Sequence, residues 1–173
     1  KTISINVLYK IDDGLSGIKK ALSKIILNVS KALENGVNII ILSDRGTSAK
    51  KAPIPMLLAC SHVHHGLKKI NKRSKFDIII ESAEPREPHH FSLLFGYGAS
   101  AINPYMVNEI IEWQVKNKTI KIDTGKAIDN FNKAVAKGII KIMNKIGIST
   151  LHSYRGAQIF EALGLNQNFT NKF

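Results

Sequence analysis

A short run of carboxylates and histidines in the middle of the chain is the part best suited to acid–base chemistry. It contains Glu81, Glu84 and His89, with Arg86 and His90 beside them. Carboxylates and imidazoles transfer protons near neutral pH when their surroundings tune their pKa values toward it. Charged residues of this kind also cluster at helix starts, where carboxylates complement the helix dipole. Helix-start chemistry is the commoner explanation, and the alternative is a stand-alone α/β enzyme that uses Glu81, Glu84 and His89.

A second group of potential ligands consists of histidines on a predicted helix. His62 and His65 are separated by three positions, so their rings share one face of that helix and could bind a common metal ion. Zinc requires further ligands, and the chain has only one cysteine, Cys60, within an apolar run. Because no motif fixes the remaining ligands, helix packing is the better interpretation of these histidines.

Short apolar runs alternate with amphipathic stretches along the whole chain, which predicts alternating strands and helices. The predicted strands are 1–10, 37–42, 76–80, 99–103 and 148–154, and the predicted helices are 15–33, 54–70, 88–95, 105–115, 125–145 and 156–163. Strands that alternate with helices are typical of a parallel α/β domain. Five such units cannot close an eight-stranded barrel, so we expect parallel βα repeats in an open sheet or in a partial or modified (β/α)8-like barrel.

Polar residues follow each predicted strand. Parallel strands point the same way, so these residues should gather at one end of the sheet, where βα folds meet ligands and partners. We call them the strand-end group and expect them to form a ligand or interdomain surface. Its members are Asp44, Arg45, Glu81, Glu84, Arg86, His89, His90, Asn103, Tyr105, Ser153 and Arg155.

Four lysines recur at every fourth position of the predicted helix 125–145. They are Lys133, Lys137, Lys141 and Lys145, which we call the lysine stripe. Like charges at this spacing repel one another slightly in an isolated helix. The apolar face of the helix must turn inward, so the stripe should be exposed and mostly unpaired. It is either a solvated face or a surface that meets acidic groups of a neighbouring domain.

The composition is that of an ordinary globular domain, with 173 residues, 44% hydrophobic content and 22% charged residues. The formal net charge of +12 raises the alternative of a basic nucleic-acid-binding module. Only four of the 25 basic residues are arginine, the residue that reads base edges best, and this composition argues against nucleic-acid binding. No apolar run has transmembrane length, and we expect no membrane partner.

Three blocks of sequence together carry a resemblance to a known family. They are ILSDRG with APIP and HVHHGL, then ESAEPREPHHFSLLFGYGASAINPY, then KAVAKGIIKIMNKIGISTLHSYRGAQIFEALGL. In this order they resemble the central domain of the glutamate synthase large subunit. Ala83 and Pro88 depart from the pattern, which has glycine and an aliphatic residue there. The resemblance implies that residues 1–165 are a central α/β domain incomplete on its N-terminal side, with 166–173 as a polar tail or linker.

The resemblance also implies a function for the intact enzyme. In that family a glutaminase domain releases ammonia from glutamine, and a barrel with FMN and an iron–sulfur cluster uses it to aminate 2-oxoglutarate reductively. The central domain holds no flavin, bridges the two sites and helps to wall the ammonia passage. We therefore expect no catalytic, cofactor-binding or metal-binding residue in this chain, and no activity from it alone. Its expected partners are the other domains of the same polypeptide, in the cytoplasm or in a plastid.

Overall fold

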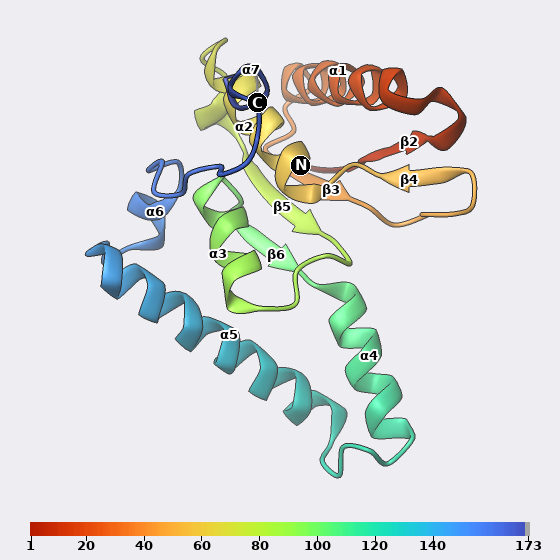
Figure 1. The fold of residues 1–173 in the computed structure, drawn as a ribbon, viewed down its shortest axis with the longest axis vertical. Coiled ribbons are helices and arrows are strands. Elements are labelled where there is room, and N and C mark those ends of the chain that lie inside the picture. The colour runs from red at the N-terminus through yellow and green to blue at the C-terminus, as the bar shows by residue number, and fades with distance from the viewer. Residues whose placement is uncertain (172–173) are drawn as a thin grey trace.

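The computed structural model describes residues 1–171 and is built around a sheet of four parallel strands (Figure 1). In order across the sheet they are β1 (Thr2–Asn6), β3 (Ile39–Ser43), β5 (Asp77–Glu81) and β6 (Ala101–Asn103). Two short strands, β2 (Leu8–Lys10) and β4 (Lys51–Pro53), form a separate antiparallel pair. The helices are α1 (Gly14–Glu34), α2 (Met56–Lys68), α3 (Pro88–Gly96), α4 (Tyr105–Lys116), α5 (Thr124–Ile146), α6 (Leu151–Tyr154) and α7 (Gln167–Thr170).

The predicted parallel α/β architecture is confirmed in its coarse form. Strands β3 and β5 pair in register, from Ile39 opposite Asp77 to Ser43 opposite Glu81. Runs of isoleucine suit such strands, because β-branched side chains pack well on a pleated surface that is covered by helices. The described residues form four parallel strands rather than the five predicted, and a barrel-like completion of this sheet stays a prediction.

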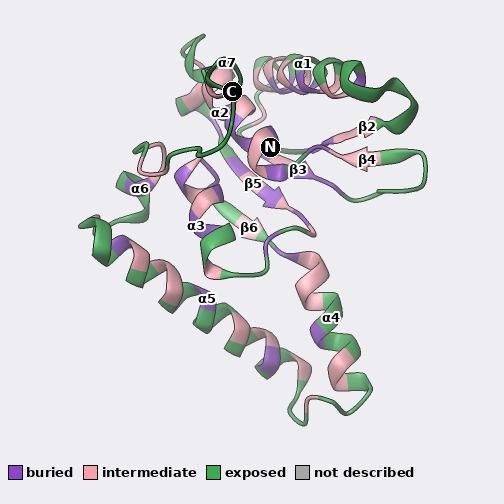
Figure 2. Ribbon diagram, viewed as in Figure 1, coloured by how far each residue is buried: buried purple, intermediate pink, exposed green. Residues whose placement is uncertain are grey.

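The core lies between one face of the sheet and the two helices α1 and α2. Alternate residues of the central strands, such as Ile40 and Leu42 of β3 and Ile78 and Ile80 of β5, are fully buried on this face. Their helical partners in the core include Leu22, Ile25 and Val29 of α1 and Met56, Ala59, Cys60, Val63 and Leu67 of α2. Figure 2 shows this buried layer above a more exposed lower half of the molecule.

The opposite face of the sheet is only partly covered by the described residues. Ile39, Ile41 and Ile79 alternate with the buried residues and are half-buried, and Ala101 of β6 is exposed. Strands β1 and β6 are the two edges, and neither pairs with another strand on its outer side within residues 1–171. Parallel sheets are usually covered on both faces. This face and these edges are therefore the surfaces on which further polypeptide could pack.

Helix α5 packs against α3, on the side of α3 away from α1 (Figure 1). Ala127, Val135 and Met143 are buried on its inner face. All four lysines of the lysine stripe are exposed, as predicted, and make no ion pair or hydrogen bond within residues 1–171. None of the described helices has both the length and the apolar character needed to cross a membrane.

The predicted strand 148–154 and helix 156–163 are wrong. Residues 151–154 form the short helix α6, since Thr150 Oγ1 accepts a hydrogen bond from the backbone N–H of Ser153 at 3.2 Å and caps a helical turn. The next segment is irregular, because Gly156 has a positive φ of 72° and donates its N–H to the carbonyl of Gly96 at 2.8 Å. A tertiary hydrogen bond thus replaces the helical one at this position.

The N-terminal strand also differs from its predicted range. Residues 1–10 divide at Val7, whose backbone bonds both Ser43 and Ile54 at 2.9 Å, so the chain leaves the parallel sheet there. Strand β2 then pairs with β4, a strand in a segment that the sequence did not identify. The short helix α7 lies inside the region predicted as a polar tail.

The close approach of α3 and α5 leads to a stability prediction. A Cβ atom on Gly138 would lie 2.5 Å from the Cβ of Pro88, so Gly138→Ala must push the two helices apart. We expect a loss of about 1–3 kcal/mol from overpacking, although alanine is intrinsically the better helix former by about 1 kcal/mol. Urea unfolding of the chain measures the difference. The control, Asn132→Ala on the exposed surface of α5, should be neutral or slightly stabilising, and equal behaviour of the two variants would contradict the packing argument.

Candidate functional site at the carboxyl ends of the strands

The buried carboxylate of Asp44 is the centre of the polar cluster that follows the strands. Its side chain is 2% exposed. One oxygen, Oδ2, accepts hydrogen bonds from the hydroxyl of Ser82 at 2.6 Å and from the backbone N–H of Ala83 at 3.0 Å. The other, Oδ1, accepts one from the hydroxyl of Tyr105 at 2.9 Å. Asp44 therefore joins the segments that follow β3, β5 and β6.

A second, more exposed layer surrounds Glu81. Its carboxylate accepts hydrogen bonds from Ser43 Oγ at 2.6 Å and from Arg45 Nε at 3.0 Å. The guanidinium of Arg45 also stacks on the ring of Tyr105, 3.8 Å from its centroid, and reaches Glu109 at 3.4 Å. The hydrogen bond from Ser43, followed by that from Arg45, lowers the pKa of Glu81. Burial and the hydrogen bond to Asp44 raise the pKa of Tyr105 to about 12.

Glu84, Arg86 and His90 stabilise the starts of two helices. The carboxylate of Glu84 accepts the backbone N–H of Met56 at 3.0 and 3.1 Å, at the start of α2. Glu84 therefore lies at the positive end of the dipole of α2. This agrees with the helix-start interpretation, except that the helix is α2 and not the following helix α3. His90 Nδ1 accepts the backbone N–H of Arg86 at 3.2 Å across the start of α3.

The structure does not bring Glu81, Glu84 and His89 together as an acid–base set. Glu81 is bonded to Ser43 and Arg45, and the exposed ring of His89 packs edge-on against Phe160 at 5.8 Å between centroids. The hollow of about 190 Å³ beside Glu84 is lined by His90, and by neither Glu81 nor His89. The stand-alone enzyme alternative therefore gains no support from this geometry.

Two predicted members of the strand-end group lie at the opposite end of the sheet. Arg155 bonds Asp77, the first residue of β5, at 3.2 Å, and Ser153 belongs to α6. Their predicted position is wrong because it depended on a strand at 148–154, which the chain does not form. Asn103 lies at the expected end, where its carbonyl accepts the N–H of Ser82 at 3.1 Å.

Three residues of the cluster were missed by sequence reasoning. Ser43 and Ser82 are buried donors to Glu81 and Asp44, and Glu109 contacts Arg45 from α4. The register pairs Ser43, the last residue of β3, with Glu81, the last residue of β5, and Ser82 follows directly. Each serine is next to a carboxylate in the sequence at the end of a predicted strand, and this pattern could have identified both. No local sequence pattern could place Glu109 in the cluster, because its contact with Arg45 depends on how α4 is oriented relative to the sheet.

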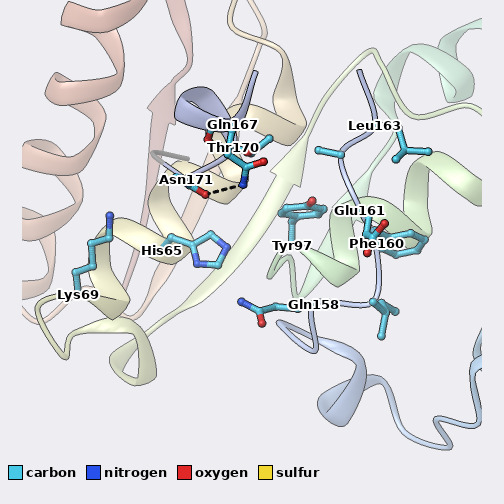
Figure 3. A pocket seen from close by; sticks show the side chains of 12 residues that line it. His65, Lys69, Tyr97, Gln158, Phe160, Glu161, Leu163, Gln167, Thr170 and Asn171 are labelled. Atoms are coloured by element: carbon cyan, nitrogen blue, oxygen red, sulfur yellow. Dashed lines mark hydrogen bonds between the residues drawn. The ribbon is translucent and has the colours of Figure 1, made fainter. Parts of the chain in front are cut away.

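A separate hollow near the C-terminal end of the chain is lined by residues outside the strand-end group. A hollow of about 580 Å³ lies between α2, the turn at Tyr97 and the C-terminal segment (Figure 3). Figure 3 shows His65 and Lys69 on one side and Phe160 and Glu161 on the other. The hollow shares no lining residue with the strand-end group, although Phe160 contacts the ring of His89.

The described residues do not fit an iron–sulfur cluster. Iron–sulfur clusters need several cysteine thiolates. Cys60 is buried, its Sγ contacts the carbonyl of Tyr97 at 3.5 Å, and burial raises its pKa to about 12. In the strand-end group, Asp44 and Glu81 accept hydrogen bonds from neighbouring side chains. Within residues 1–171 no three His, Cys, Asp or Glu side chains are grouped to hold a metal ion.

A family model and several individual relatives identify the same protein family. The family model of the glutamate synthase central domain matches residues 1–166. The chain belongs to the glutamate synthase central-domain family. The NADPH glutamate synthase large chain of Bacillus subtilis is 39% identical over 173 residues, which is all of this chain and 11% of that protein.

Two further relatives extend the glutamate synthase match to eukaryotes. The NADH glutamate synthase of Schizosaccharomyces pombe is 40% identical over 174 residues, covering 99% of this chain and 8% of that protein. The chloroplastic ferredoxin-dependent glutamate synthase of Spinacia oleracea is 38% identical over 181 residues, covering 97% of this chain and 11% of that protein. The chain thus spans about a tenth of the length of these relatives.

The glutamate synthase central domain also resembles a solved structure in its fold. A mutant flavocytochrome b2 with benzoylformate aligns with a TM-score of 0.54 and 14% sequence identity. The alignment covers 86% of this chain and 38% of that one. At this identity the likeness concerns the arrangement of strands and helices alone.

A buried histidine stabilises the opposite end of the sheet. His64 is 9% exposed, and its Nδ1 accepts a hydrogen bond from Arg73 Nε at 3.0 Å. The guanidinium of Arg73 also donates to the carbonyls of Phe76 at 2.7 Å and Gly98 at 2.8 Å. A side chain at Gly98 would collide with the His64 ring, so glycine is required there. Burial, followed by the charge of Arg73, lowers the pKa of His64 to about 4.

The buried carboxylate predicts a ranking of variants. Asp44→Asn keeps one acceptor oxygen but turns an N–H₂ donor toward the donors of Ser82, Ala83 or Tyr105. We expect it to lower the free energy of unfolding by about 1–3 kcal/mol, whereas Tyr105→Phe, which removes one hydrogen bond, should cost about 0.5–1.5 kcal/mol. Urea titrations of the two variants and the parent chain give the comparison. A smaller loss for Asp44→Asn than for Tyr105→Phe would contradict the central role of Asp44.

His64 predicts a dependence of stability on pH. Its pKa is about 4 in the folded chain and near the usual value of about 6.5 in the unfolded chain. The unfolded state therefore binds more protons between these values, so stability falls as the pH is lowered from about 6.5 toward 4. The urea midpoint should drop over this window, and less steeply in His64→Gln. An identical slope in the parent chain and in His64→Gln would rule out this contribution.

Proposed function

We propose that this chain is an internal, non-catalytic domain of a glutamate synthase, which bridges a glutaminase domain and an FMN-containing synthase domain and contributes to the ammonia passage between them. The observation that carries the proposal is the chain's full-length match to glutamate synthases of which it is only about a tenth. The reaction of the intact enzyme would be the reductive amination of 2-oxoglutarate with ammonia derived from glutamine.

The internal bonding of the strand-end group supports a structural role. Asp44 accepts hydrogen bonds from Ser82 and Tyr105, and Glu81 accepts one from Arg45, so the group is a preassembled surface rather than an open reaction centre. Arg45 and Glu109 remain about half exposed, at 48% and 55% of their side-chain surfaces. They are the polar groups that a neighbouring domain would meet first at this end of the sheet.

The open sheet supports the proposed domain limits. We propose that residues 1–165 belong to a central α/β domain whose N-terminal part lies outside this chain, with 166–173 leading into the next domain. Further strands would pair with the edges β1 or β6 and would cover Ile39, Ile41 and Ile79. Such an addition would give the barrel-like arrangement that the likeness to flavocytochrome b2 suggests.

The cofactors and the compartment follow from the parent enzyme. FMN and an iron–sulfur cluster would be held by other parts of the polypeptide, since the one cysteine of this chain is buried in its core. The purified chain should therefore show neither flavin absorbance nor turnover of glutamine or 2-oxoglutarate, and either observation would contradict a bridging role. The compartment would be the cytoplasm, or a plastid as in the spinach relative.

Charge reversal of the lysine stripe tests whether it meets another domain. The variant Lys137→Glu/Lys141→Glu alters two exposed, unpaired side chains. The isolated chain should keep its melting temperature, because surface substitutions change the free energy of unfolding by only about 0.5 kcal/mol. In the full-length enzyme we expect glutamine hydrolysis to continue while glutamate formation per glutamine falls, because ammonia escapes from a misaligned passage. The ratio of the two products measures this coupling.

The matched control places the same charge change on α1. Lys19→Glu/Lys20→Glu also reverses two exposed lysines and should leave both the melting temperature and the product ratio unchanged. Unaltered coupling in Lys137→Glu/Lys141→Glu would reduce the lysine stripe to a solvated surface.

A further inference from the structure

The amino ends of strands β3 and β5 border a broad basic groove, at the end of the sheet opposite Asp44 and Glu81. It has a volume of about 850 Å³ and opens between the end of α2 and the segment that follows α6. Ile39 and Phe76 are the large apolar residues of its lining. We call this hollow the amino-end groove. A neighbouring hollow of about 330 Å³ shares Ile39, Asp77 and Arg155 with it and extends it toward β6.

The charge of the amino-end groove is strongly unbalanced. Its lining contains the cations Lys68, Arg73, Lys75 and Arg155 and a single carboxylate, Asp77. That carboxylate already accepts bonds from Arg155 at 3.2 Å and from the hydroxyl of Ser100 at 2.5 Å. The groove therefore presents an excess of positive charge in a concave surface, where the field of several cations adds up.

The two arginines are not available as a clamp for a small anion. Arg73 uses its guanidinium on His64, Phe76 and Gly98, and Arg155 uses its own on Asp77, Ser100 and His152. A phosphate or a lone carboxylate is usually held by bidentate arginine contacts, which are already occupied here. The exposed ammonium groups of Lys68 and Lys75 remain free to pair with an incoming ligand. This arrangement suits carboxylates spread along an extended ligand better than one compact anion.

The apolar residue Ile39 in the lining further restricts which ligands fit the groove. Ile39 is half-buried at the first position of β3, next to the uncovered face of the sheet. A peptide that alternates acidic and apolar side chains would pair with the lysines and cover the half-buried Ile39. A nucleic acid would neutralise the cations but would leave the apolar side chain of Ile39 uncovered. The relatives are about ten times longer than this chain, so a peptide of this kind has ample polypeptide from which to come.

We propose that the amino-end groove receives an acidic segment, with apolar side chains between its carboxylates, from the same polypeptide outside these 173 residues. This inference rests on the proposal that the chain is an internal domain of a longer enzyme. It adds a second docking surface at the end of the sheet opposite Asp44 and Glu81. The two ends would then be held by different parts of the polypeptide.

Site-specific photo-crosslinking in the full-length enzyme tests the proposal. A photo-crosslinking residue in place of Lys75 should capture one peptide of the same polypeptide that is rich in aspartate and glutamate, identified by mass spectrometry. The same residue in place of Lys19, on the exposed surface of α1, is the control and should not capture that peptide. Capture of a separate protein or of nucleic acid, or no specific product at Lys75, would overturn the proposal.

A charge reversal next to the crosslinking position adds a quantitative check. Lys68→Glu in the enzyme with the crosslinker at position 75 should lower the yield of the acidic peptide about threefold to tenfold, since a surface ion pair is worth up to about 1 kcal/mol and a new repulsion adds to the loss. Lys20→Glu is the matched control and should leave the yield unchanged. An unchanged yield in Lys68→Glu would contradict charge recognition in the groove.

The crosslinking result and the coupling result are independent of each other. If the acidic peptide is captured while Lys137→Glu/Lys141→Glu keeps normal coupling, the amino-end groove is a docking surface and the lysine stripe is a solvated surface. If the peptide is captured but the purified chain itself shows flavin absorbance or turnover of glutamine, the groove proposal stands and the bridging function fails. If coupling depends on the lysine stripe but no acidic peptide is captured, the bridging function stands and the groove proposal fails.

Discussion

The buried carboxylate of Asp44 is the interaction on which the carboxyl end of this domain depends. A charged group in the interior is tolerated only when hydrogen bonds replace the water it has lost. Asp44 obtains them from Ser82, Ala83 and Tyr105, which belong to the segments after β5 and β6. Removing any one donor leaves part of a buried charge unsatisfied, so the three βα connections are stabilised together. The exposed layer of Arg45 and Glu81 is built on this anchored base.

The two ends of the parallel sheet differ in their electrostatics. At the carboxyl end, acidic side chains such as Glu81 and Glu84 are matched by Arg45 and by the start of α2. At the amino end, one carboxylate, Asp77, faces several cations in the amino-end groove. An internally balanced surface favours rigid packing, whereas an unbalanced one favours a ligand of opposite charge. The same sheet therefore offers two surfaces with different requirements for what binds them.

The uncovered face of the sheet is consistent with the short length of this chain compared with its relatives. Helices α1 and α2 cover one face, and Ile39, Ile41 and Ile79 remain half-buried on the other. Parallel strands buried on a single face are uncommon, because their side chains are apolar on both sides. This incomplete burial is what a piece of a larger glutamate synthase would show, and the chain spans about a tenth of such proteins. Stability measured on this chain will therefore report a domain with part of its apolar surface exposed.

The sequence by itself determined the elements whose signal is local and repeated. The isoleucine runs at 39–42 and 78–80 and the long apolar face of α5 are strong enough to predict strands and a helix, and strand direction then placed Asp44, Arg45 and Glu81 together. Only the tertiary structure decided what lies after α5. Thr150 caps a helical turn, and Gly156 bonds Gly96 instead of continuing a helix, so Arg155 reaches Asp77 at the amino ends of the strands. The contacts of Gly156 with Gly96 and of Arg155 with Asp77 join residues that are far apart in the chain, and no periodicity in the sequence encodes them.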